Sequence, residues 1–290
     1  MANINLKAPV NIPVEKIRPF EGHPYKVSDN DEMNNLIESI QQKGVISPIV
    51  VRPLEDTDNE YEIISGHRRL RASVKAGLDT VPALIYAVTR DEAAIMLVDS
   101  NLHREHILPS ERAFAYKLKM EAMSRQGSRS DLTSCQVGTK LRTDEIIAEN
   151  STDSARQIQR YIRLTSLIPE LLDLVDEERI AFTPAVELSY LNEVEQADLV
   201  EEIRVCDATP NLSQAQRLRA ISRDEGLTPE HIGEILAEDK ANQKPMIKMP
   251  AEKIQKIAPK IKEKDLEDFI LKSCEYYYRH LMRSRDRDAR

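Results

Sequence analysis

The chain has 290 residues, of which 41% are hydrophobic and 31% are charged, and its formal net charge is −8. This length predicts two or three domains, and an aromatic content of 4% with no Trp favours a helix-rich protein over a β-sandwich. The three widely separated cysteines, Cys135, Cys206 and Cys274, exclude a metal-binding or redox motif and favour a reducing compartment. Without an apolar leader or a membrane-length apolar run, the protein is expected to be cytoplasmic and to have no membrane partner.

The negative charge is unevenly distributed along the chain. Residues 170–202 contain eleven acidic residues and one Arg, a net charge of −10, whereas residues 244–264 contain seven Lys and two Glu, a net charge of +5. Residues 64–75 contain three Arg and one Lys with no acidic residue. Local charge, and not the overall negative charge, therefore decides whether a part of the chain suits nucleic acid or another anion.

The first 88 residues alternate between strand and helix patterns. Apolar residues recur at helical spacing between residues 33 and 40, behind a cap at Asp29 or Asn30, and Gly44 is placed to end this helix. The other predicted elements are strands at residues 12–18, 45–51, 61–64 and 81–88 and a helix between Gly66 and Gly77. This order predicts a small α/β unit.

A glycine turn connects the strand at residues 61–64 to this second helix. The helix opens with basic-capable side chains: His67, Arg68, Arg69 and Arg71. Glycine lets the backbone approach a bound group closely, and the first amides of a helix can hold an anion. A polyphosphate would suit such arginines, although a solvated Arg-rich helix face would account for the same residues equally well.

Two further helices are predicted at residues 91–99 and 111–125, and the Ser-, Thr- and Gly-rich residues 127–143 are predicted as a loop. Short helices follow at residues 142–148 and 154–164. The polar positions of the second short helix are Ser154, Arg156, Gln157, Gln159, Arg160 and Arg163. A helix–turn–helix places such a helix in the major groove, where Arg and Gln pair with guanine and adenine edges, but an ordinary helical hairpin is an equal alternative.

The remainder of the chain is predicted to be largely helical. Residues 168–191 and 211–240 have helical patterns, whereas the lysine-rich residues 244–264 contain three prolines and cannot form one helix. Residues 265–282 predict a terminal helix whose apolar stripe serves either an internal core or the pairing of two chains. The tail from residue 283 is predicted to be disordered.

Three sequence boxes, in this order, resemble those of the ParB family of plasmid and chromosome partition proteins. Residues 44–52 (GVISPIVVR) resemble the family's G-x-x-Q-P-I-x-V-R box, residues 66–72 (GHRRLRA) its G-E-R-R-x-R-A box, and residues 99–105 (DSNLHRE) its E-N-x-Q-R-E box. The resemblance covers about residues 10–200. It implies an α+β N-terminal ParB-like nucleotide-binding domain, an all-α helix–turn–helix domain, and a linker with a helical C-terminal module that could dimerise. The expected boundaries are residues 1–125, 126–205 and 206–290.

The resemblance implies a DNA-binding partition protein that loads at a palindromic site on double-stranded DNA through its helix–turn–helix. CTP with Mg²⁺, bound at the GHRR turn, would switch the homodimer into a DNA clamp, and an ATPase of the ParA type would be its partner. By position, the nucleotide-binding residues are Ser47, Gly66, His67, Arg68, Arg69, Arg71 and Arg104. Asn101 and Asp99 would hold the metal, and Ser100 and Asn101 occupy the positions tied to a weak CTP hydrolase activity.

The chain departs from the family pattern at several positions. His67 and Ser100 each replace a Glu, and His103 replaces a Gln. Ser is a weaker Mg²⁺ ligand than a carboxylate, and the neighbouring Asp99 would point about 100° away on a helix. Nucleotide binding is therefore expected more firmly than hydrolysis. The alternative is a helix–turn–helix transcription or plasmid-copy regulator that does not hydrolyse nucleotide. Residues 183–185 (TPA) also depart from the family pattern, because they replace a G-H-A-R-type turn, and this puts a dimer-loading contact in doubt.

Overall fold

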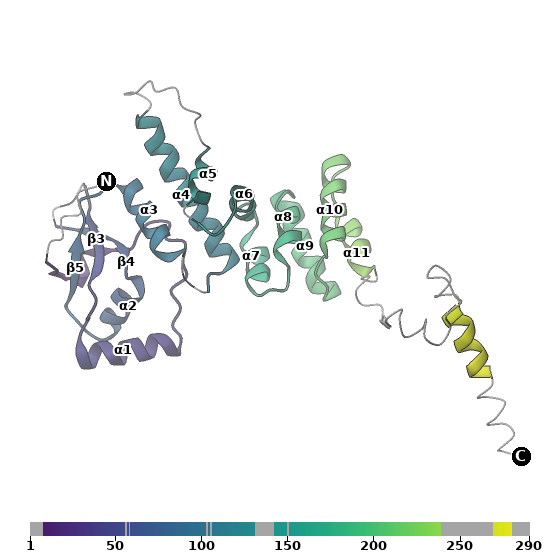
Figure 1. Ribbon diagram of the computed structural model, residues 1–290, viewed down its shortest axis with the longest axis horizontal. Helices are drawn as coiled ribbons and strands as arrows, with labels where there is room; N and C mark the ends of the chain where they lie inside the picture. Colours follow the sequence, from purple (N-terminus) through teal and green to yellow (C-terminus); the bar gives the residue numbers. More distant parts are fainter. Residues whose placement is uncertain are drawn as a thin grey trace, which may run out of the picture. The chain divides into compact units, whose positions relative to one another are not determined.

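The computed structural model describes residues 8–55, 57, 59–102, 104, 106–130, 142–149, 151–238 and 269–279, with residues 127–130 described by their backbone. The chain divides into two units, residues 1–238 and 239–290. In the first unit, five strands and two helices come first and a long series of helices follows (Figure 1). The predicted mixed α/β domain followed by helices is therefore confirmed.

The five strands form one sheet in the order β1-β5-β3-β4-β2. Their bounds are β1 Val10–Pro13, β2 Ile17–Arg18, β3 Ile49–Pro53, β4 Tyr61–Ser65 and β5 Thr80–Ile85. β5 is antiparallel to β1 and parallel to β3, whereas β4 is antiparallel to β3 and parallel to β2. The strand predicted at residues 45–51 begins only after Pro48, which has no N–H to donate to a neighbouring strand.

The single strand predicted at residues 12–18 is wrong, because a 3₁₀ turn at Val14–Lys16 divides it into β1 and β2. These two strands lie at opposite edges of the sheet. A flat sheet of five strands is roughly 19 Å wide, but the four residue steps from Pro13 to Ile17 span at most about 14 Å. The sheet must therefore curl until its edges approach each other. The curl encloses a core of buried residues: Ile12, Ile17, Ile49, Val51, Ile63, Val81 and Ala83.

Two helices lie together beside the sheet, α1 (Asp31–Lys43) and α2 (His67–Lys75) (Figure 1). Asn30, one of the two predicted caps, accepts a hydrogen bond from the Met33 amide. Met33 is fully buried and belongs to the same core as Ala72 of α2. α1 ends at Gly44, whose φ of 70° confirms the predicted glycine stop.

α3 (Arg90–Asn101) and α4 (Pro109–Ser130) pack against each other beside β4. α3 is capped by Thr89 and Glu92 and extends two residues beyond its predicted end, so that it includes Ser100 and Asn101. α4 extends into the predicted loop as far as Ser130, and residues 131–141 lie outside the described residues.

In the described residues of the first unit, seven helices follow: α5 Thr143–Glu149, α6 Ala155–Leu164, α7 Pro169–Asp176, α8 Phe182–Leu188, α9 Glu193–Cys206, α10 Leu212–Asp224 and α11 Pro229–Ala237. One hydrophobic core extends from Leu164 at the end of α6 to Leu236 in α11. The acidic residues of this region therefore lie on helices whose other faces share a continuous core.

In the second unit, residues 269–279 are helical, within the helix predicted at residues 265–282. Cys274 and Tyr277 of its predicted apolar stripe are exposed. The lysine-rich segment at residues 244–264 and the tail from residue 283 lie outside the described residues. No helix in the described part of the chain is long and apolar enough to span a membrane.

Candidate functional site

The turn between β4 and α2 requires glycine for two reasons. Gly66 has a φ of 101°, a conformation that residues with a Cβ rarely adopt. A Cβ at this position would lie 2.9 Å from the Cγ2 atom of Ile49 and 3.2 Å from the Nη2 atom of Arg69. No side chain caps α2, so its first amides have no partner from a capping group. The turn therefore presents helix amides beside a backbone that another group can approach closely.

Two of the arginines that open α2 form exposed ion pairs with residues of α1 and of the segment before it. Arg68 pairs with Glu32 at 2.9 Å, and Arg71 donates to both carboxylate oxygens of Asp29 at 2.9 and 2.7 Å. Hydrogen bonds from Arg71 and then from Lys75 lower the pKa of Asp29 to about 2. Such exposed pairs contribute little stability, so both guanidinium groups can exchange their carboxylates for another anion.

Arg69 contacts the loop that contains the first sequence box. Its Nη1 atom donates to the backbone oxygens of Ser47 and Pro48, at 2.6 Å each. Ser47, Arg69 and Gly44 line a cavity of about 170 Å³ beside α1. The structure thus brings together two of the predicted boxes, and it places the predicted nucleotide-binding residues Ser47 and Arg69 in direct contact.

His67 belongs to a cluster that also contains His23, Tyr25 and Arg104. The rings of His67 and His23 lie 3.7 Å apart between centroids, and the guanidinium of Arg104 lies 5.6 Å from the centroid of the Tyr25 ring. The Nε2 atom of His67 and the hydroxyl of Tyr25 are buried without a hydrogen-bond partner among the described residues. The sequence predicted His67 and Arg104 but missed His23 and Tyr25, because no motif marks the loop that contains them.

The electrostatics of this cluster favour neutral imidazoles. Burial, and then the charges of the neighbouring His23 and Arg104, lower the pKa of His67 to about 3. Burial likewise lowers the pKa of His23 and raises the pKa of the Tyr25 hydroxyl. A buried anion placed here would face a guanidinium and two groups that can donate hydrogen bonds.

The predicted metal-binding residues at the end of α3 have other partners. Asp99 pairs at 2.5 Å with Lys119 of α4, whose side chain is only 4% exposed. The Ser100 hydroxyl and the Asn101 amide both donate to the Leu97 carbonyl, at 2.9 and 2.7 Å. In the described part of the chain, no group of three or more His, Cys, Asp or Glu side chains could hold a metal. Mg²⁺ is usually held by one or two carboxylates together with phosphates. Because the Asp99 carboxylate is bound to Lys119, and Ser100 and Asn101 supply no carboxylate, these residues do not fit Mg²⁺ in this arrangement. His103 lies outside the described residues.

The second predicted site lies on α6, which packs on α4 and α5. Ile147 of α5 and Ile158 of α6 are fully buried in one cluster with Tyr116 of α4. The Tyr116 hydroxyl donates to Asp153 at 2.6 Å, and Ser154 caps α6 by accepting from the Gln157 amide at 3.3 Å. Ser154 therefore has a capping role in addition to the predicted role in DNA binding.

The polar side chains of α6 differ in how firmly they are held. Arg160 donates to the Thr183 hydroxyl at 3.1 Å and to Gln157 at 3.2 Å, and it lies over the Phe182 ring. Arg163 donates to the Ser189 backbone oxygen at 2.7 Å and lies over the Tyr190 ring. Both arginines therefore connect α6 to α8 and to the residues that follow it.

Two further polar side chains of α6, those of Gln159 and Arg156, are less constrained. Gln159 is exposed and donates to Asp144 of α5 at 3.0 Å, and Arg156 is exposed. Arg156 and Gln159 are therefore the α6 side chains that are best placed to reach a partner.

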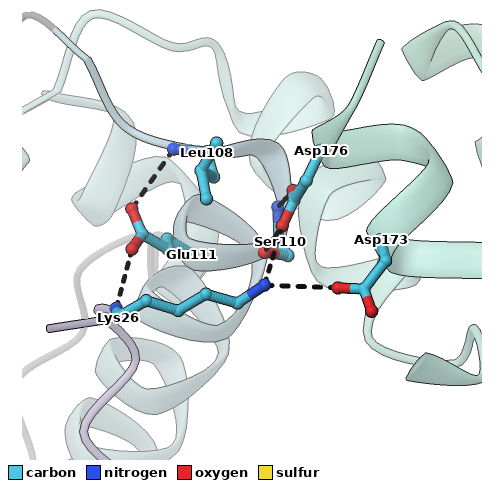
Figure 2. A network of polar contacts seen from close by, with 6 residues as sticks. All are labelled: Lys26, Leu108, Ser110, Glu111, Asp173 and Asp176. Carbon is cyan, nitrogen blue, oxygen red and sulfur yellow. Dashed lines mark hydrogen bonds and ion pairs between the residues drawn. The ribbon is translucent and has the colours of Figure 1, made fainter. Parts of the chain in front are cut away.

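A polar network connects the loop after Tyr25 to the helical part of the chain (Figure 2). The Lys26 amide donates to Glu111 at 2.7 Å, while its ammonium contacts Asp173 and Asp176 of α7 at 3.3 and 3.4 Å. Ser110, in the first turn of α4, donates to Asp176 through its amide and its hydroxyl, at 3.0 and 2.6 Å. The start of α4 is therefore bonded to both the loop and α7.

Comparison with known proteins identifies the class of the α/β domain. The family model of the ParB N-terminal domain matches residues 2–102, which contain the sheet, the Gly66 turn and the end of α3. A nucleoid occlusion protein of Listeria monocytogenes serovar 1/2a is 30% identical over 223 residues, which cover 73% of this chain and 75% of that protein. The chain belongs to the ParB family.

Two other matches cover different shares of the chain. A probable chromosome-partitioning protein ParB of Pseudomonas putida is 35% identical over 147 residues, 51% of this chain and 48% of that protein. Among solved structures, C-terminally truncated ParB from Caulobacter crescentus complexed to the centromeric parS site matches with a TM-score of 0.43 and 23% identity. That match covers 73% of this chain and 98% of the other.

Proposed function

We propose that this chain is a DNA-binding partition protein whose N-terminal domain binds CTP at the Gly66 turn. The family membership supports the function, and the conformation of Gly66 is the observation that carries the nucleotide site. A glycine held at a φ of 101°, with no room for a Cβ, leaves the start of α2 open to a phosphate. CTP is the nucleotide that the sequence boxes imply.

In this proposal, the residues of the α2 start bind the nucleotide in distinct ways. Phosphate oxygens accept hydrogen bonds from the first amides of α2, and Arg68 and Arg71 leave Glu32 and Asp29 to bind them. The base lies beside the loop that ends at Ser47, whose backbone oxygen already accepts from Arg69. The chain acts as a homodimer that loads through α5 and α6 at a palindromic DNA site and closes around DNA when nucleotide binds. A ParA-type ATPase is its partner.

Nucleotide titrations test the first part of the proposal. CTP, ATP, GTP and UTP are titrated separately into the purified full-length protein, with and without DNA, and the heat of binding is measured. We expect CTP to bind most tightly. The Gly66→Ala variant should lose this binding, whereas Gly22→Ala, at a glycine with a similar φ of 78° and open space around it, should retain it. Equal affinity for all four nucleotides would contradict the proposed switch.

DNA binding by α6 is tested with Arg156→Ala, using fragments from the neighbourhood of the gene as candidate sites. If Arg156 reads a base, its loss costs about 1–3 kcal/mol on the cognate site and much less on random DNA. If Arg156 contacts phosphate, both affinities fall together and the dependence on salt becomes less steep. The second result would remove base reading by Arg156 and leave the proposed DNA contact.

A regulator that binds DNA without hydrolysing nucleotide is the second candidate function. The contacts at the end of α3 favour it, because Asp99 is paired with Lys119 and Ser100 donates to the Leu97 carbonyl. The measurement is phosphate release from CTP in the presence of the cognate DNA. Release stimulated by that DNA would exclude the regulator, whereas DNA binding without any release would favour it.

A further inference from the structure

One cluster of buried and charged side chains has a role that the proposed function leaves open. It consists of His67, His23, Tyr25 and Arg104. We propose that this cluster holds nucleotide phosphate directly, through the His67 imidazole and the Arg104 guanidinium, and that phosphate binding here requires no divalent cation. The inference rests on the proposed nucleotide site and concerns how that site balances the charge of its ligand.

The unpartnered nitrogen of His67 is the first observation. Its Nε2 atom is buried without a hydrogen-bond partner in the described part of the chain. Leaving such an atom unsatisfied costs about 1–3 kcal/mol, so a ligand atom that bonds to it is favoured by that amount. His67 is the first residue of α2, and a phosphate at the amides of this helix end would be beside its imidazole.

The sign of the surrounding charge is the second observation. Among the described residues, His23 and Arg104 act electrostatically on His67, and both oppose a positive charge on its ring, which lies 3.7 Å from the His23 ring between centroids. Arg104 acts in the same direction on His23. A divalent cation at this position would be repelled by Arg104, whereas a phosphate would be attracted to it. The cluster is therefore built for an anion.

The carboxylates around the site are the third observation. The described carboxylates near the site all have partners: Asp99 is bound to the buried Lys119, Asp29 to Arg71 and Lys75, Glu32 to Arg68, and Glu111, which acts on Tyr25, to the amides of Lys26 and Leu108. Moving Asp99 to a metal would leave the Lys119 ammonium buried without its partner, which is strongly unfavourable. Moving Glu32 or Asp29 would remove the partner of an arginine that the proposed site needs. The Arg104 guanidinium thus supplies the positive charge that a metal ion would otherwise supply, and the neutral His67 imidazole adds a hydrogen bond.

The experiment measures CTP binding to the full-length protein by calorimetry in buffer with Mg²⁺ and in buffer with EDTA. For the unmodified protein, we expect CTP to bind no more than about threefold more weakly in EDTA than in Mg²⁺, because the site attracts the phosphates directly and needs no cation between them. The matched variants are His67→Gln, which retains a neutral hydrogen-bond donor, and His67→Glu, which places a carboxylate beside the phosphates. Thermal unfolding of both variants establishes that they are folded.

His67→Gln should bind CTP equally well in both buffers. His67→Glu should bind at least about tenfold more weakly in EDTA than in Mg²⁺, because its carboxylate repels phosphate unless a cation lies between them. A second readout is the imidazole ¹H–¹⁵N spectrum, in which the His67 signals should shift when CTP is added in EDTA.

The outcomes separate this inference from the function on which it rests. If the unmodified protein binds CTP in Mg²⁺ and loses tenfold or more of its affinity in EDTA, the metal-free site is wrong and the nucleotide proposal stands. Unshifted His67 signals during CTP binding would also overturn the inference. If no CTP binds in either buffer, the nucleotide site and this inference both fail.

Discussion

Two arginine-rich helices, α2 and α6, have similar patterns in the sequence and different contacts in the structure. At the start of α2, Arg68 and Arg71 pair with exposed carboxylates on the surface. On α6, Arg160 and Arg163 lie over aromatic rings and donate to the residues of α8 and its C-terminal end. The first kind of contact can be exchanged for a ligand at little cost, whereas the second is part of the packing that holds the helix in place.

The difference shows that the number of arginines on a helix does not reveal how many of them are available. On these two helices, the available Arg68 and Arg71 have carboxylate partners with access to water. Arg160 and Arg163 instead lie over aromatic rings and donate to a hydroxyl and a backbone oxygen.

The largest effect is expected for the glycine that starts α2. Gly66→Ala should lower the free energy of unfolding by about 3 kcal/mol, for two reasons. An alanine disfavours this left-handed backbone conformation, and its Cβ would clash with Ile49. Gly22→Ala adds only the backbone cost, about 1 kcal/mol. Urea unfolding measures both variants. Equal losses would mean that the approach of Ile49 is relaxed and that the turn tolerates a side chain.

The second effect distinguishes the two groups of arginines directly. Arg163→Ala should cost about 2 kcal/mol, because it leaves the buried Ser189 backbone oxygen without this donor and removes the stacking on Tyr190. Arg68→Ala and Arg156→Ala, at exposed positions, should each change stability by less than about 0.5 kcal/mol. The distinction fails if Arg68→Ala destabilises the protein as much as Arg163→Ala does.

The third effect depends on pH and concerns the His67 cluster. The pKa of His67 is about 3 in the folded protein and 6.5 when unperturbed, so between these values the unfolded chain binds a proton that the folded chain does not. Stability is therefore fully present above pH 6.5 and falls as pH decreases toward 3, by up to about 1.4 kcal/mol per pH unit for this group. Urea unfolding at several pH values measures this effect. Between pH 7.5 and pH 5, the free energy of unfolding should fall less steeply for His67→Gln than for the unmodified protein.

Local signals in the sequence predicted much of the fold. The Asn30 cap, the Gly44 stop, the Gly66 turn and the α5–α6 pair all depend on residues close together in the chain, so their patterns could be recognised. The division at Val14–Lys16 could not be predicted, because the apolar alternation is the same whether a segment pairs with one edge of a sheet or with two.

The candidate sites were predicted by residue type, and their contacts were not. Thr183 is 23 residues from Arg160, and Lys119 is 20 residues from Asp99. No local pattern connects such pairs, so the sequence could not show that these groups are engaged. His23 and Tyr25 were missed for the same reason, because the tertiary fold alone brings their loop to His67.

The curl of the sheet has a consequence for the order of folding during synthesis. β1 and β2 leave the ribosome first, but their partners in the sheet come much later: Ile12 pairs with Val81 and Ile17 with Tyr61. Contacts this distant in the sequence require the closure of long loops before any pairing energy is gained, which slows folding. The edge that β2 covers must therefore remain open until β4 has been made, and the edge that β1 covers until β5 has been made. The sheet is then completed late, when the nine-residue segment at residues 10–18 has found both of its partners.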